Sequence, residues 1–147
     1  MTVPNESPAL PDEGLTDLLS EIRLLVPGTL ILVAFLIALP FNSGYTTISR
    51  LDNAVYVALF ICAMISLLIF IAPAAQHRLM SPLTDRAAFV NRQVIIGLIP
   101  LSAAITLASY FVISDVVSHL AAGIVAGIVG LAIAVLWWII PLSKRRR

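Results

Sequence analysis

The sequence predicts an all-α integral membrane protein: a four-helix bundle with an N-terminal amphipathic helix and both termini in the cytoplasm. The prediction rests on four long stretches free of Asp, Glu, Lys and Arg, and on basic residues biased to one side of them. Each stretch is about as long as the ~20-residue helix that crosses a hydrocarbon core. Backbone groups in lipid must be satisfied within the segment, so these stretches predict helices. The expected spans are about residues 24–41, 54–75, 94–114 and 120–142.

Composition limits what else the chain can contain. Its 147 residues are 60% hydrophobic, and the residues outside the spans are divided among two tails and three connections. Pieces of that size cannot bury a water-soluble core. We therefore expect one membrane domain over residues 27–142 and no separate catalytic domain.

The residues before the first span predict first a disordered segment and then an amphipathic helix. Residues 1–13 are rich in Pro and polar residues, which predicts a disordered lead-in. Residues 14–26 predict a helix at the cytoplasmic interface, and Pro27-Gly28 predicts a bend into the membrane. An acidic stretch precedes the run, so we expect a retained helix and not a signal peptide. Its apolar face, which we expect to pack on the bundle or on a neighbouring subunit, comprises Leu15, Leu18, Leu19, Ile22, Leu25 and Val26.

The connections carry turn and capping signals. Asn42-Ser43-Gly44 predicts a turn after the first span, and Asp52 is a candidate N-cap for the second. Ser81-Pro82 predicts the start of a new helix ahead of the third span. The third connection, residues 115–119, is short enough to require a tight turn between antiparallel helices.

The distribution of basic residues predicts the orientation. Of the nine Lys and Arg residues, Arg50 alone falls on the side opposite the termini. The positive-inside rule therefore places both termini in the cytoplasm. The basic tail, residues 143–147, is interpreted as a cytoplasmic stop, because four basic residues without interleaved aromatics do not predict nucleic-acid binding. Trp137 and Trp138 are then expected at the inner interface.

Small residues on the fourth span predict close helix packing. Such residues let helix backbones approach in lipid, either within one bundle or between subunits, and the sequence leaves both alternatives open. The expected partners are the lipid bilayer and either a second copy of the chain or a larger membrane complex. The packing residues are Gly123, Gly127, Gly130 and Ala134, and a weaker ladder that could pack on them is Ala54, Ala58, Cys62 and Ser66.

The third span is the most polar and contains Pro100, which predicts a kink. Its hydroxyl residues have two interpretations: the lining of a transport pathway, or side chains bonded to carbonyls of their own helix. The possible polar pathway is Ser102, Thr106, Ser109 and Asp115. Asp115 and His119 could exchange a proton, but the favoured interpretation has Asp115 or Ser118 capping the fourth helix.

Several functions are disfavoured by what the spans lack. No Asp, Glu, Lys or Arg lies in the middle of a span, although an ion pathway normally needs one. The residues at membrane depth build no catalytic arrangement, and the histidines and Cys62 lack metal-ligand spacing. We therefore expect no enzymatic activity, no metal and no cofactor. Interactions are expected at a cytoplasmic face made of Glu21, Arg23, His77, Arg78, Asn91 and Arg92.

A set of short landmarks resembles a known group. They are Glu21-Ile22-Arg23 ahead of Pro27-Gly28, the run Phe35–Phe41, Ala72-Pro73 with His77-Arg78, Asn91-Arg92, and Ser114-Asp115-Val116. Over roughly residues 14–142 the chain is similar to a bacterial family of small four-helix integral membrane proteins of unknown function. The resemblance implies the same fold and a bacterial plasma membrane. It also implies the label sodium:proton antiporter that members often carry, although Leu30 stands where the family is expected to have Gln.

These observations favour a non-enzymatic membrane component, either a small homo-oligomer or an accessory subunit of a membrane complex. The alternative is an oligomeric ion or proton transporter, with the polar face of the third span lining a pathway between subunits.

Overall fold

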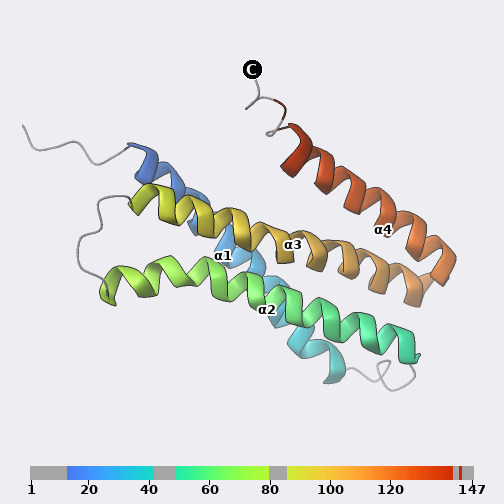
Figure 1. Cartoon of the computed structure of the whole chain (residues 1–147). Helices are drawn as coiled ribbons and strands as arrows, with labels where there is room; N and C mark the ends of the chain where they lie inside the picture. The colour runs from blue at the N-terminus through green and yellow to red at the C-terminus, as the bar shows by residue number, and fades with distance from the viewer. Residues whose placement is uncertain (1–12, 42–48, 80–85, 141–142, 144–147) are drawn as a thin grey trace, which may run out of the picture.

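The computed structural model describes residues 13–41, 49–79, 86–140 and 143. Apart from Ser49, Val117 and Ser118 the chain is helical in these ranges, and the four long helices confirm the predicted all-α class (Figure 1). Each is long and apolar enough to cross a membrane, so the protein is a multi-pass membrane protein. The elements are α1 (Glu13–Ala38) with a 3₁₀ turn η1 (Leu39–Phe41), α2 (Arg50–Leu79), α3 (Arg86–Val116), and α4 (His119–Ile133) with a π-helical end η3 (Ala134–Ile139).

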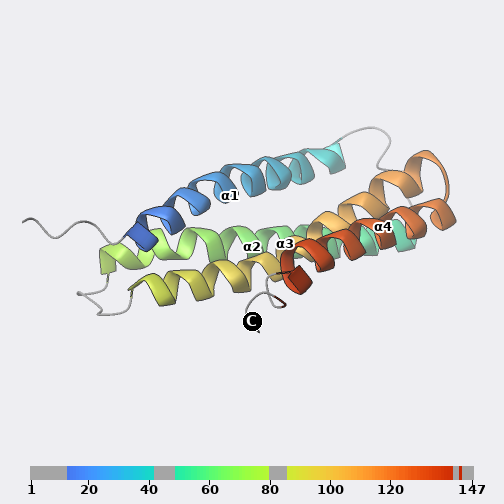
Figure 2. The ribbon, with the colours of Figure 1, turned by 90° about the horizontal axis from the view of Figure 1, so that it is seen from above.

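The helices form three layers. α2 and α3 lie side by side in the middle, α1 lies against both on one side, and α4 lies on the other (Figure 2). Within the described residues α4 makes close backbone contact with α3 but with neither α1 nor α2. The suggestion that the small residues of the second span pack on those of the fourth is therefore wrong.

The tightest contact joins α2 to α3. Gly97 on α3 is buried under the ring of Phe70, which is 1% exposed, and a Cβ at this glycine would lie 2.6 Å from Phe70 Cε1. Beside them the buried Ser66 hydroxyl donates a hydrogen bond of 3.0 Å to the Gly97 carbonyl oxygen. α3 runs through Pro100, one turn further along, without interruption. The absence of a side chain at Gly97 thus sets the spacing of the two central helices.

Two hydroxyls donate hydrogen bonds to backbone carbonyls of α1. The Tyr56 hydroxyl donates to the Leu36 carbonyl across 2.9 Å. Leu36 lies in the last turn, where carbonyls have no partner within the helix. The buried Thr29 hydroxyl donates to the Leu25 carbonyl of its own helix.

The amphipathic helix and the first span are not two separate helices, because α1 is one continuous α-helix through Pro27 and Gly28. Proline removes only one helix hydrogen bond, whereas a break would leave several backbone groups without partners, which is costly in an apolar environment. The boundary expected between residues 26 and 27 therefore does not divide the structure. Of the predicted lead-in over residues 1–13, Glu13 is the first residue of α1, and residues 1–12 lie outside the described residues. The Asn42-Ser43-Gly44 turn, the Ser81-Pro82 helix start and the tail residues 144–147 also lie outside them.

Candidate functional site: a polar cluster where three helices meet

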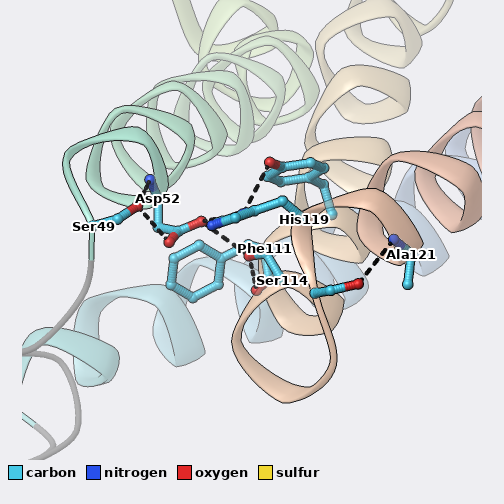
Figure 3. A network of polar contacts seen from close by, with 8 residues as sticks. Ser49, Asp52, Phe111, Ser114, His119 and Ala121 are labelled. Carbon is cyan, nitrogen blue, oxygen red and sulfur yellow. Dashed lines mark hydrogen bonds and ion pairs between the residues drawn. The ribbon is translucent and has the colours of Figure 1, made fainter.

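Polar side chains gather at the end of the molecule where α2 begins, α3 ends and α4 begins (Figure 3). Around the carboxylate of Asp52 lie two serines, a tyrosine and a histidine from these three helices. We call this group the Asp52 cluster, defined as Ser49, Asp52, Tyr110, Ser114 and His119.

Ser49 and Asp52 build the start of α2. The Asp52 backbone N–H donates to Ser49 Oγ over 3.1 Å, and the Ser49 hydroxyl donates to Asp52 Oδ2 over 2.7 Å. Ser49 is therefore the residue that caps the helix, and Asp52 lies three positions later, as in a capping box. The prediction that Asp52 is the N-cap is wrong. Its carboxylate is directed towards α3 instead (Figure 3).

Ser114 joins α3 to α2 through Asp52. Its hydroxyl lies 3.0 Å from Asp52 Oδ1 and 2.9 Å from the Phe111 carbonyl oxygen of its own helix. A hydroxyl has one proton to donate, so the two acceptors share it. The Asp52 side chain is 13% exposed, and hydrogen bonds from Ser49 and Ser114 compensate for the loss of water around its charge.

His119, the first residue of α4, reaches the same carboxylate. Its Nδ1 lies 3.8 Å from Asp52 Oδ1 and 3.4 Å from the Tyr110 hydroxyl oxygen. The Tyr110 and His119 rings stack with their centroids 6.5 Å apart. The His119 side chain is 57% exposed, so bulk water reaches the imidazole. The Nδ1 atom of His119 therefore faces two partners, Asp52 on α2 and Tyr110 on α3.

Ser118 caps α4, which confirms one of the two predicted candidates. Its backbone is extended and its hydroxyl oxygen accepts from the Ala121 N–H over 3.3 Å. Asp115 is exposed and lies inside the last turn of α3, so it is not the cap.

Replacing Ser118 with alanine is expected to lower the free energy of unfolding by about 1 kcal/mol, because a helix N–H loses its acceptor. Unfolding in mixed detergent micelles, followed by circular dichroism, measures the change. Asp115→Ala is the matched control, and its expected change is below about 0.5 kcal/mol. An equal loss in both variants would contradict the assignment.

The hydroxyls of the third span bond to their own helix. Ser102 donates to the Leu98 carbonyl, Thr106 to the Ser102 carbonyl and Ser109 to the Ile105 carbonyl, at 2.7–2.9 Å. This is the second of the two predicted interpretations. The face nevertheless borders an open groove of about 350 Å³ between α3 and α4, lined by Ser102, Ala103, Thr106, Leu107, Gly130, Ile133, Ala134 and Trp138.

The small residues of α4 divide into two groups. Gly130 approaches the Thr106 side chain, where an added Cβ would lie 3.4 Å from Cγ2, and Ala134 lines the groove beside it. Gly123 and Gly127 are exposed, and a Cβ built on either would have no atom within 4 Å. The buried Ala122 and Ala126 also lie on the face of α4 that packs on α3.

The residues predicted for a cytoplasmic face lie at the opposite end from the Asp52 cluster (Figure 1). Glu21, Arg23, Asn91 and Arg92 are exposed there, whereas the side chains of His77 and Arg78 lie outside the described part. No ion pair joins Glu21 to Arg92, both of which are described. Trp137 lines a groove with Glu21, which places the end of α4 at this same end of the molecule.

Comparison with known proteins adds a family match over residues 10–141, described as a family of unknown function, DUF6328. The chain belongs to the DUF6328 family. The match covers all four helices, and it confirms the expected resemblance to a family of unknown function. No curated protein and no solved structure matches the chain.

In this DUF6328 member, the described residues contain no group of three or more His, Cys, Asp or Glu side chains placed to hold a metal ion.

Asp52, Tyr110 and Ser114 were not predicted to meet. The sequence carried one signal, a serine three residues before Asp52 at the start of a span, which is the spacing of a capping box. The contacts to α3 and α4 had no signal, because they depend on how the helix ends are placed in space.

Proposed function

We propose that this DUF6328 member is a non-enzymatic membrane protein that acts as a homo-oligomer and uses α4 as its assembly surface. The observation that carries the proposal is the position of α4. It makes close backbone contact with α3 alone, and it presents Gly123 and Gly127 to open space.

The chemistry of this surface suits a second helix. In lipid, helices associate through close packing and interhelical hydrogen bonds, and small and hydroxyl residues favour both. Gly123 and Gly127 continue along α4 into Gly130 and Ala134, and Ser102 and Thr106 form the facing wall of the groove. A helix of a second copy could approach closely along this line. An accessory subunit docked at the same place would use the same contacts.

We also propose that the protein resides in a bacterial plasma membrane with both termini in the cytoplasm. The support is the bias of Lys and Arg, of which Arg50 alone falls on the opposite side. On this orientation the Asp52 cluster faces the outside. Reporter fusions at the C-terminus and within residues 42–48 test the orientation, with the cytoplasmic reporter expected to be active at the C-terminus only.

Gly127→Leu is expected to convert the oligomer to a monomer, because the new side chain fills the space that a second helix would occupy. The added Cβ meets nothing within the protomer, so the fold is expected to persist. Native mass spectrometry from mild detergent would show wild-type protein at a multiple of 15.8 kDa and the variant at 15.8 kDa.

Ala132→Leu is the matched control. Ala132 is exposed on the opposite flank of α4, so the same enlargement there should leave the oligomer intact. A monomeric wild-type protein, or equal dissociation by both variants, would contradict homo-oligomer assembly through Gly127. A different chain co-purifying with the wild type and lost in Gly127→Leu would indicate the accessory-subunit form.

The alternative function, ion or proton transport between subunits, is favoured by the groove beside Ser102 and Thr106. Vesicles containing the purified protein under a proton or sodium gradient test it. Flux that disappears in Asp115→Asn, or in Thr106→Val, would favour transport over the structural role. Without flux from the folded protein, the assembly role remains the proposal.

A further inference from the structure

The Asp52 cluster connects parts of the molecule that otherwise do not meet. α4 has no close backbone contact with α2 within the described residues, yet His119 Nδ1 lies 3.8 Å from Asp52 Oδ1. His119 and Asp52 form the one ion pair found among the described residues. Its existence depends on a proton, because imidazole is charged only when both ring nitrogens carry hydrogen.

The same nitrogen has two neighbours with different hydrogen-bonding ability: the Asp52 carboxylate can only accept a hydrogen, whereas the Tyr110 hydroxyl can donate or accept one. A hydrogen on Nδ1 can be donated to the Asp52 carboxylate on α2. Without that hydrogen, Nδ1 becomes an acceptor for the Tyr110 hydroxyl on α3, whose oxygen is 3.4 Å away. Protonated His119 always carries a hydrogen on Nδ1 and pairs with the Asp52 carboxylate as an ion, whereas neutral His119 has one hydrogen for its two ring nitrogens, and with that hydrogen on Nε2 its Nδ1 can accept from Tyr110. The second proton therefore strengthens the attachment of the first residue of α4 to α2.

We propose that the Asp52 cluster is a proton-binding site in which protonated His119 holds the start of α4 to Asp52 on α2, and that this hold weakens when His119 is neutral and its Nδ1 can accept from Tyr110. This inference goes beyond the proposed function and does not depend on oligomer formation. Histidine is the side chain that proteins ordinarily use as a pH-dependent switch.

The surrounding groups fit this assignment. On α2, Arg50 lies two residues before Asp52 and is exposed, and on α3, Asp115 adjoins Ser114 and is exposed. α1 ends nearby in Leu39–Phe41, which has no titratable side chain. Of the described carboxylates near the cluster, Asp52 is the one whose oxygen pairs with the imidazole.

The position of His119 gives the test a definite sign. The N-terminus of a helix carries partial positive charge, so a protonated histidine at the first residue of α4 should weaken that end. The Asp52 carboxylate opposes this effect. With Asp52 in place, acid should therefore strengthen the attachment of α4, and without it acid should loosen the same turn.

Amide hydrogen exchange of α4 residues 122–126, in lipid nanodiscs and corrected for the intrinsic rate, measures local opening of this helix end. In the wild-type protein, exchange at about pH 5 is expected to be about two- to fivefold slower than at about pH 8. In Asp52→Asn the order reverses, and exchange is expected to be about two- to fivefold faster at the acidic pH. In Tyr110→Phe, the amides of residues 122–126 should exchange faster than in the wild-type protein at the alkaline pH only.

Asp115→Asn, which removes an exposed carboxylate beside the cluster, is the matched control and should respond as the wild type does. His119→Gln keeps a polar side chain that does not titrate, and its exchange should be independent of pH. This second variant keeps the test decisive if Asp52→Asn folds poorly. A wild-type protein without the acid protection, an unchanged response in Asp52→Asn, or a persisting response in His119→Gln would each overturn the proposal.

Discussion

Phe70→Ala is expected to lower the free energy of unfolding by about 3 kcal/mol, the low end of the range for a buried Phe replaced by alanine. The Phe70 side chain is 1% exposed and lies against Gly97 on α3. Its removal leaves a cavity between the two central helices, so packing contacts are lost. The low end applies because lipid is itself apolar, and transfer of the ring out of water contributes little.

Unfolding of Phe70→Ala in mixed micelles measures this loss. Phe35→Ala is the matched control, because Phe35 is exposed on α1 and its side chain faces the surroundings of the protein. We expect its effect to be below about 0.5 kcal/mol. Similar losses in both variants would mean that the contact of α2 with α3 is not the centre of the fold.

Gly97→Ala is expected to destabilise the protein by about 1–3 kcal/mol, the usual cost of overpacking. The new Cβ would lie 2.6 Å from Phe70 Cε1 and 3.1 Å from Ile69 Cγ2, so the helices must separate or the ring must move. Gly28→Ala is the control, because a Cβ there meets nothing within 4 Å.

The two substitutions should interact, which a double-mutant cycle measures. With the Phe70 ring removed, the Gly97 methyl has room, so Gly97→Ala should cost much less in the Phe70→Ala background. A coupling of about 0.5–3 kcal/mol is expected for residues in such contact. Additive effects would contradict the proposed close approach.

The sequence was sufficient to predict the four spans and the helical class. A long apolar stretch without charged residues is almost enough by itself to predict a membrane helix. The described helices contain the core of each expected span. Pro27-Gly28 was misleading for a related reason. A Pro-Gly pair often ends a helix in soluble proteins, whereas within an apolar span the cost of unpaired backbone groups favours continuing the helix through it.

The pairing of helices was less predictable. The row of small residues on α4 signalled close packing, but Gly130 faces α3 while Gly123 and Gly127 face open space. Small residues promote contact with any helix, so the row could not specify its partner. The Asp52 cluster was missed because Asp52 lies far from His119 in the sequence, whereas Asp115 lies in the same short turn and was the carboxylate considered for proton exchange with it.

The most direct test of the central claim, that the open face of α4 is an assembly surface, is disulfide cross-linking in native membranes. The single native cysteine, Cys62, is first replaced by alanine. Gly123→Cys is then expected to form a disulfide dimer on oxidation, and Ala126→Cys, buried against α3, is not. A dimer from Ala126→Cys, or none from Gly123→Cys or Gly127→Cys, would contradict the account.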